Sequence, residues 1–218
     1  MYNWKEYNIN SNKLAIKFDN YNSDNYFNKI ESSYYNHTRD LFCLSLLRLS
    51  KNKNICLDYG SNTVSISNIK NKIKLNKFQF YIFNPFLENI KKRKKLKDVR
   101  YKEFKKIENF DKKIDFLNFG SSLQYLENPK EIIKKFKFNS KALLLITATP
   151  FTLNKAYTSV QKNHKKLTQN IRNLDELISF LNRKKFKMIF KSSIEIEKSS
   201  IKYLKKNTFF LNLLFEKY

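Results

Sequence analysis

Cysteine is scarce in this sequence, and its scarcity limits the chemistry that the chain can carry. The 218 residues include two cysteines, Cys43 and Cys56, which lie far apart without a C-x-x-C pattern or a neighbouring histidine. Zinc sites need closely spaced ligands, and disulfides are typical of secreted chains. We therefore expect two buried free thiols and no metal site.

Long apolar runs are also absent from the sequence. No stretch approaches the roughly 18 to 20 apolar residues that cross a bilayer. The first residues, MYNWKEYNINSNK, lack the apolar segment of a signal peptide. These absences predict a cytoplasmic protein with no membrane span.

Glycine and proline are rare, with two and three residues respectively, and neither a linker nor an internal repeat divides the chain. The hydrophobic fraction of 41% and the aromatic fraction of 16% exceed those of a disordered polycation. The length suits one domain. We expect one structural unit, in which an N-terminal cap segment at residues 1–52 precedes an α/β domain at residues 53–218.

Acidic residues are few beside the basic ones, which gives a formal net charge of +25. One explanation is a surface for a polyanion such as nucleic acid. The other is genome bias, because the excess is mainly lysine and accompanies asparagine, isoleucine, phenylalanine and tyrosine, which all have A/T-rich codons. Both explanations stay open. The densest basic run, KKRKKLK at 91–97, is predicted to be a solvated helix face.

Short apolar runs alternate with helical patterns from residue 53 onward. This alternation is typical of βα units around a doubly wound, mainly parallel sheet. Several runs are apolar on both faces, as buried parallel strands are. The expected strands cover residues 54–59, 78–83, 98–102, 113–119 and 142–148.

The second half of the chain carries clear helix signals. Asn128 can cap a helix that has Pro129 in its first turn and Glu131 at the third position, and that runs to about residue 136. Another helix opens at Asn173. The segments KMIFKSSIEIEK and TFFLNLLFEKY then predict two strands, the last an antiparallel edge strand. That ending is a feature of class I methyltransferases.

Ligands of open parallel sheets bind beyond the carboxyl ends of the strands. The first strand ends in Asp58, Tyr59 and Gly60, and the other glycine of the chain, Gly120, directly follows the fourth. A glycine at such a turn permits close approach of the backbone to a ligand, although Gly60 can also simply end a strand. Asn84 follows the second strand, where a carboxylate would normally bind a ribose diol.

Candidates for proton transfer are few. His164 lies in a long polar stretch between the fifth strand and Arg172, and such a loop is typical of a lid or an acceptor-binding segment. His164 can act as a general base or be an exposed residue without a role. His37 and Asp40 stand at the expected start of a leucine-rich helix, where Asp40 can be a helix N-terminal charge.

Aromatic and amide side chains provide candidate contacts for adenine or for an acceptor. Gln124 and Tyr125 follow the fourth strand, and Trp4 lies in the N-terminal segment. Gln124 and Tyr125 can equally pack against a helix turn, and for Trp4 packing within the cap is the favoured alternative.

Several of these segments together resemble a family of S-adenosylmethionine-dependent methyltransferases found among polysaccharide-biosynthesis genes. The resemblance spans most of the chain, and LQYL is its most specific part. The matching residues are Trp4, Arg39-Asp40, Asp58-Tyr59-Gly60, Ser121-Ser122-Leu123-Gln124-Tyr125-Leu126-Glu127-Asn128-Pro129 and Thr149-Pro150-Phe151.

The resemblance implies the class I methyltransferase fold, with S-adenosylmethionine as the cofactor. The implied cofactor contacts are Asp58, Tyr59, Gly60, Asn84, Gly120 and Ser121. The implied acceptor contacts are Trp4, Arg39, Gln124, Tyr125 and Phe151. Methyl transfer can proceed by holding donor and acceptor in line, so a dedicated base is optional.

Three functions are compatible with these residues. The first is O-methylation of a sugar or other small polar acceptor in polysaccharide biosynthesis. The second is a catalytically silent binding module, because Asn62, Asn84 and Ala148 depart from the family pattern of small, acidic and arginine residues. The third is RNA methylation, which predicts a continuous basic face beside the pocket.

Overall fold

The computed structural model describes residues 33–60, 66, 73–83, 101–104, 107, 110–161, 167–194 and 201–218. Predictions for Trp4, Asn62, Asn84, His164 and the run 91–97 fall outside the described residues. For His37 and Arg39 the backbone alone is described. The predicted boundary between a cap at 1–52 and a domain at 53–218 stays a prediction.

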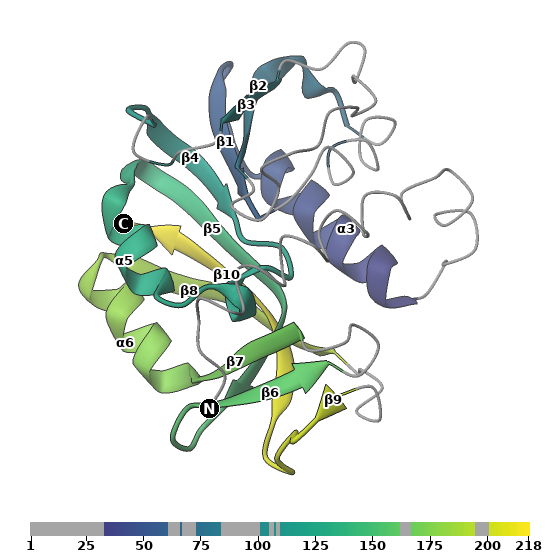
Figure 1. Cartoon of the computed structure of the whole chain (residues 1–218). Helices are drawn as coiled ribbons and strands as arrows, with labels where there is room; N and C mark the ends of the chain where they lie inside the picture. The colour runs from purple at the N-terminus through teal and green to yellow at the C-terminus, as the bar shows by residue number, and fades with distance from the viewer. Residues whose placement is uncertain are drawn as a thin grey trace.

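A central mixed sheet organises the molecule, and its parallel half has the strand order β3-β2-β1-β4-β5 (Figure 1). Beyond β5 the strand β10 runs antiparallel to both β5 and β8. The strands are β1 (Asn54–Tyr59), β2 (Phe78–Phe83), β3 (Tyr101–Phe104), β4 (Lys113–Asn118), β5 (Lys137–Thr152), β8 (Phe186–Ile194) and β10 (Phe209–Lys217). The predicted doubly wound sheet with a terminal antiparallel strand is confirmed.

The last strand is not at the edge, which corrects one prediction. β10 is paired on both sides, by β5 and β8, whereas β8 pairs only with β10 among the described strands. The run FLNLLF in β10 is buried throughout, while most side chains of β8 are at least partly exposed. A strand that is apolar on both faces belongs inside a sheet, so β10 lies between its neighbours.

Two predicted strands also have different bounds. The third strand lies at Tyr101–Phe104 instead of 98–102. The fifth is much longer than 142–148, and Thr149, Pro150 and Phe151 lie within it instead of after it. The strand continues past a register shift because Ala148, with φ +50°, donates its N–H to the Asn212 side chain at 2.9 Å.

The polar stretch after β5 is not the long loop that was predicted. It contains β6 (Tyr157–Gln161) and β7 (Leu167–Asn173), which pair antiparallel, and β6 also pairs with β9 (Ile201–Lys202). β7 joins this small sheet to the end of β5 at Phe151 and Arg172. The mostly polar side chains hid these strands, because period-2 alternation is weak where both faces carry polar residues.

Helices cover both faces of the sheet (Figure 1). Helix α3 (Ser33–Leu47) lies on one face, and α5 (Pro129–Lys135) and α6 (Leu174–Arg183) pack into the core of the other. The predicted caps are confirmed, since Asn128 accepts from Glu131 N–H at 3.4 Å and Asn173 from Glu176 N–H at 2.9 Å. Asp40 lies mid-helix, because the polar turns before it are helical too, so it is not the predicted N-terminal charge.

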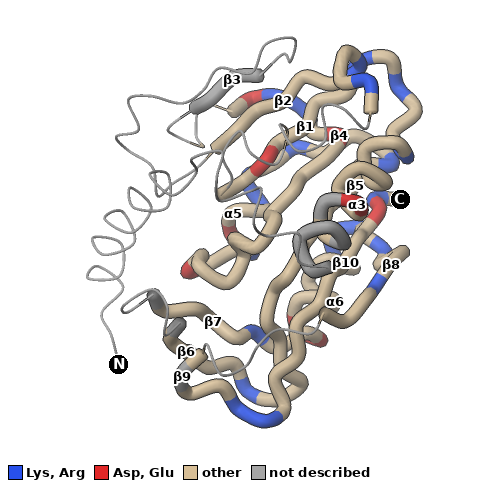
Figure 2. The backbone as a smooth tube through the Cα atoms, turned by 90° about the vertical axis from the view of Figure 1, so that its right-hand side faces the viewer, with Lys and Arg blue, Asp and Glu red and all other residues tan. Residues whose placement is uncertain are grey.

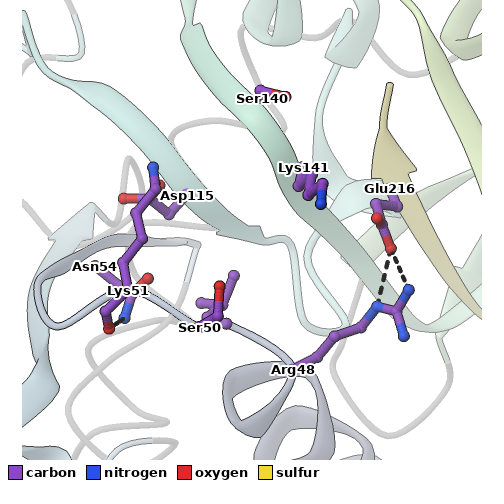
Figure 3. A pocket seen from close by; sticks show the side chains of 9 residues that line it. Arg48, Ser50, Lys51, Asn54, Asp115, Ser140, Lys141 and Glu216 are labelled. Atoms are coloured by element: carbon purple, nitrogen blue, oxygen red, sulfur yellow. Dashed lines mark hydrogen bonds and ion pairs between the residues drawn. The ribbon is translucent and has the colours of Figure 1, made fainter.

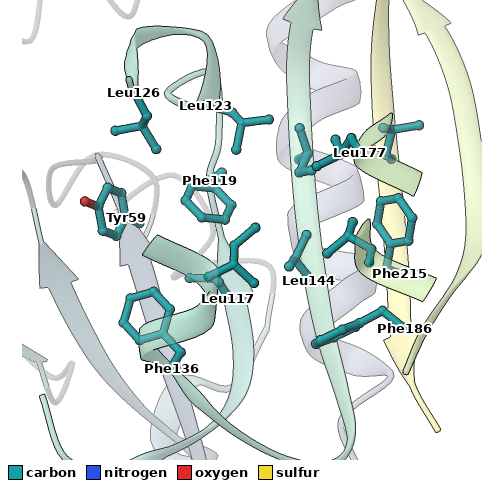
Figure 4. Close-up of a cluster of buried hydrophobic side chains, with 14 of the residues drawn as sticks. Tyr59, Leu117, Phe119, Leu123, Leu126, Phe136, Leu144, Leu177, Phe186 and Phe215 are labelled. Carbon is teal, nitrogen blue, oxygen red and sulfur yellow. The ribbon is translucent and has the colours of Figure 1, made fainter. Parts of the chain in front are cut away.

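Side chains of successive residues along each strand point to opposite faces of the sheet and belong to two different hydrophobic clusters. Leu57, Leu117 and Leu144 join the cluster under α5 and α6, together with Phe186 and Phe215 (Figure 4). Their neighbours Cys56, Phe116, Leu143 and Leu145 join the cluster under α3, with Leu41, Phe42 and Leu46. Both cysteines are free and buried, as predicted. No described helix is long and apolar enough to cross a membrane.

Candidate functional site

Two glycine turns lie side by side at the carboxyl ends of β1 and β4. Gly60 has φ +81° and Gly120 has φ +28°, both on the positive side that glycine adopts readily. β1 and β4 are paired, with Asp58 opposite Asn118. The chain proceeds from β1 to β2 on one side and places β4 on the other, so these turns flank the point where the strand order reverses. Ligands of open α/β sheets bind at such a point.

A buried hydrogen-bond network connects the two turns. The Asn118 amide donates to Asp58 Oδ1 at 2.8 Å, and Asn118 Oδ1 accepts from Gly120 N–H at 3.0 Å. Asp58 is 1% exposed and Asn118 is 4% exposed. The Asp58 carboxylate therefore acts through Asn118 on the shape of the second turn.

Ser122 provides a second connection between the two turns. Its hydroxyl donates to Tyr59 O at 2.7 Å and also contacts Phe119 O. A Cβ atom on Gly60 would lie 2.7 Å from Ser122 Oγ. Gly60 N–H donates to Phe83 O at 2.6 Å, which ties the turn to β2 as well. The absence of a side chain at Gly60 is thus required by the protein's own packing.

A ligand at this edge meets mainly backbone. Gly60 and Gly120 are partly exposed and Ser121 is exposed, while Asp58 and Tyr59 are buried beneath them. We call the three residues Gly60, Gly120 and Ser121 the glycine shelf. Tyr59 belongs to the core, where its ring lies 4.8 Å from that of Phe83. The predicted cofactor roles of these residues stay predictions.

The predicted acceptor residues have different surroundings. Gln124 is 3% exposed and its amide oxygen lies 3.5 Å from the Thr149 hydroxyl. Tyr125 is half-buried in the short 3-10 helix η3 (Leu123–Tyr125), and Phe151 is completely buried. Their contacts with an acceptor stay predictions. Asp40, a candidate for proton transfer, is exposed on α3, and that role stays a prediction too.

Arg172 is a residue of this region that the sequence did not single out. It lies beside Phe151 in the sheet, and its guanidinium donates to Leu126 O and, at 3.2 Å, to Glu127 O. Asn170 on the same face of β7 also donates to Leu126 O at 3.2 Å. Burial lowers the pKa of Arg172 to about 10. Only strand pairing brings this arginine to LQYL, so no sequence spacing reveals it.

Solved structures provide the comparison for this arrangement. No protein-family model matches the sequence, and no curated protein matches it either. The 1,6-didemethyltoxoflavin-N1-methyltransferase of Burkholderia thailandensis is similar with a TM-score of 0.60 and 10% identity, over 100% of this chain and 91% of that one. The magnesium protoporphyrin IX methyltransferase of Synechocystis PCC 6803 is similar with a TM-score of 0.51 and 10% identity, over 95% of this chain and 97% of that one. The 4+2 cyclase SpnF is similar with a TM-score of 0.53 and 13% identity, over 86% of this chain and 83% of that one.

The chain has the class I methyltransferase fold. Within this fold the glycine shelf lies at the carboxyl edge of the parallel strands. The 4+2 cyclase has the same fold and a different reaction in its name, so the fold alone does not fix the chemistry.

Proposed function

We propose that this protein is a methyltransferase that binds S-adenosylmethionine on the glycine shelf and methylates a small polar acceptor. The observation that carries the proposal is the pair of glycine turns at the reversal point, joined through Asp58 and Asn118. Two similar structures with this fold are methyltransferases, one with bound S-adenosylhomocysteine and one with bound S-adenosylmethionine.

The shelf fits a cofactor that approaches along the backbone. Gly60 and Gly120 carry no side chain, and Ser121 is exposed, so these three residues would hold the cofactor. Asp58 and Asn118 would fix the shape of the turns from beneath. S-adenosylmethionine supplies an activated methyl group when bound. The chain's part is to hold the two reactants in line, which requires no dedicated base.

A small polar acceptor, such as a sugar, suits the surroundings of the shelf. η3 follows the Gly120 turn, and Asn170 and Arg172 of β7 donate to the carbonyls of Leu126 and Glu127 directly after it. Amide and guanidinium groups of this kind also hydrogen-bond sugar hydroxyls. A role in polysaccharide biosynthesis rests on the sequence resemblance alone.

Lysines of the described part of the chain gather mainly at the amino edge of the sheet. Lysines stand at or beside the first residues of β1, β2, β4, β5 and β8, at the amino edge of the parallel strands. Figure 2 shows blue segments on the side of the molecule that carries the C-terminus, and further blue segments at the end that carries β6 and β9. An RNA methyltransferase is expected to place its basic face beside the glycine shelf. Among the described residues, the lysine row lies at the opposite edge, and the exposed Lys155, Lys205 and Lys206 stand near the carboxyl end of β5.

Calorimetric titration with S-adenosylhomocysteine tests the proposed function. We expect binding to the wild-type protein, and Ser121→Trp should weaken it by about tenfold or more, because the indole would cover the shelf. Ser179→Trp on the exposed face of α6 is the matched control and should bind like wild type. Equal affinities of the two variants would exclude the shelf as the cofactor site.

A binding module without catalysis is a second function that one observation favours. The N–H groups of both glycines already donate to protein acceptors, Phe83 O and Asn118 Oδ1, which leaves fewer donors for a ligand. The same titration separates the two functions. Absence of S-adenosylhomocysteine binding at millimolar concentration, in a protein with a cooperative thermal transition, would support the second function.

A further inference from the structure

A polar cavity of about 300 Å³ lies at the amino edge of the sheet, on the opposite side from the glycine shelf. Its volume falls at the lower end of the range of small-molecule sites. The end of α3, the start of β1, and parts of β4, β5 and β10 surround it (Figure 3). The lining residues are Arg48, Leu49, Ser50, Lys51, Asn54, Asp115, Ser140, Lys141 and Glu216.

Both carboxylates of the cavity are already neutralised. Glu216 accepts from Arg48 Nε at 2.9 Å and from Nη2 at 2.5 Å, as drawn in Figure 3. Asp115 accepts from Lys51 Nζ at 2.6 Å and from Ile55 N–H at 2.9 Å. These ion pairs leave no excess negative charge that would repel an anion from the cavity.

Two other groups that line the cavity, Asn54 Oδ1 and the Lys141 ammonium, are unpaired among the described residues. Asn54 is 1% exposed, and its Oδ1 accepts no hydrogen bond although its amide donates to Lys51 O at 2.8 Å. A buried acceptor without a donor is unfavourable by about 1 to 3 kcal/mol. Lys141 is exposed and forms no ion pair with any carboxylate in the described part of the chain. Within the described part of the chain, the cavity thus offers Lys141 as an unpaired cation and Asn54 Oδ1 as a buried acceptor.

The backbone places Lys141 at the cavity in an unusual way. Its φ of +61° is in the left-handed region, which residues with a side chain seldom adopt. The register between β4 and β5 shifts at this point, between Ile114 and Phe116. The bulge therefore turns a lysine that regular pairing would orient differently, and the exposed hydroxyls of Ser50 and Ser140 lie at the same cavity.

We propose that this cavity is a binding site for a small phosphorylated polyol, such as a sugar phosphate. The phosphate would bind Lys141 with the hydroxyls of Ser50 and Ser140, and a ligand hydroxyl would donate to Asn54 Oδ1. An anion alone leaves the Asn54 acceptor unsatisfied, whereas a phosphorylated polyol satisfies both groups. The site is distinct from the glycine shelf, so it does not depend on the proposed function.

The lysine row at the amino edge supports an anionic ligand. Lys53, Lys77, Lys113 and Lys137 stand at or directly before the first residues of four neighbouring strands and are not among the cavity-lining residues. Their field raises the local concentration of anions at this edge without direct contact. Genome bias can supply many lysines, but it does not select the starts of parallel strands for them.

Calorimetric titration of the full chain with glycerol 3-phosphate tests the site. We expect binding that Lys141→Ala weakens by about tenfold and that Lys137→Ala, on the same strand and outside the cavity, changes by about twofold or less. Propyl phosphate, which keeps the phosphate and lacks the hydroxyls, should bind about tenfold more weakly than glycerol 3-phosphate. Thermal transitions of both variants verify that they fold.

Four outcomes would overturn the site. Absence of glycerol 3-phosphate binding at millimolar concentration is the first. The second is equal weakening by Lys141→Ala and Lys137→Ala, which would assign the binding to diffuse surface charge. The third is equal affinity for inorganic phosphate, propyl phosphate and glycerol 3-phosphate. The fourth is tighter binding of a short RNA that both variants weaken alike, which would assign the lysine row to nucleic acid.

Discussion

Ser122 occupies the space beside Gly60 that a side chain at Gly60 would need, with Ser122 Oγ 2.7 Å from the position of such a Cβ atom. The same hydroxyl donates to Tyr59 O, the residue before Gly60. The two turns of the glycine shelf are therefore packed into each other, and neither can change its shape alone.

Gly60→Ala should lower the free energy of unfolding by about 3 kcal/mol, from the sum of a left-handed alanine and the overlap with Ser122. In a Ser122→Gly background the same substitution should lower it by only about 1 to 2 kcal/mol, because the overlap is gone and the backbone strain remains. Urea unfolding of the four proteins gives both values. Equal effects in the two backgrounds would contradict the packing argument.

Asn118→Ala should lower the free energy of unfolding by about 2 kcal/mol, because the buried Asp58 carboxylate loses a donor and the Gly120 turn loses an acceptor. The substitution should also weaken S-adenosylhomocysteine binding. Asn139→Ala is the matched control, since Asn139 donates to Asp115 at 2.8 Å in the same way at the opposite edge. Asp115 retains Lys51 and Ile55, so the control should cost less than about 1 kcal/mol and leave binding unchanged.

Arg172→Lys should lower the free energy of unfolding by about 2 kcal/mol, because an ammonium cannot reproduce the planar contacts with the Leu126 and Glu127 carbonyls. Arg183→Lys at the exposed end of α6 should change it by less than about 0.5 kcal/mol. Chemical unfolding compares the two. A negligible effect of Arg172→Lys would mean that β7 is held to LQYL by other contacts.

Cys56 gives the protein a defined response to alkaline pH. Burial, and then the charges of Asp115 and Asp58, raise the pKa of the Cys56 thiol well above its usual value. Below the unfolded pKa of about 8.5 both states hold the proton, and this group does not change stability with pH. Above it the unfolded thiol alone ionises, so the free energy of unfolding should fall by about 1.4 kcal/mol per pH unit.

Cys56→Ala should remove this part of the pH dependence, which denaturant unfolding between pH 8 and about pH 10 would measure. The wild-type protein, measured over the same pH range, is the reference. A slope of Cys56→Ala equal to that of the wild type would contradict the assignment to Cys56.

The sequence indicated the parallel sheet because its strands are apolar on both faces and its helices carry local caps. Asn128 and Asn173 act within three residues of their own positions, and such short-range signals can be predicted. Gly60 and Gly120 were placed at one edge by the same logic. The length of β5 was not predictable, because Pro150 is a local signal against a strand, and the left-handed Ala148 that lets the strand continue is seen only in the structure.

Strand pairing determined which residues from distant parts of the sequence lie close together. Nothing in the spacing of Arg172 and Leu126 indicates that they meet, and nothing in the spacing of Asn54 and Lys141 indicates that they line one cavity, because both arrangements depend on sheet order and on a register shift. The sequence by itself determined which strands are buried and where the chain turns, since burial pattern and turn chemistry are local. The tertiary structure alone decided that Ser122 fills the space beside Gly60 and that a bulge turns Lys141 to a cavity, since both need strands brought together from afar.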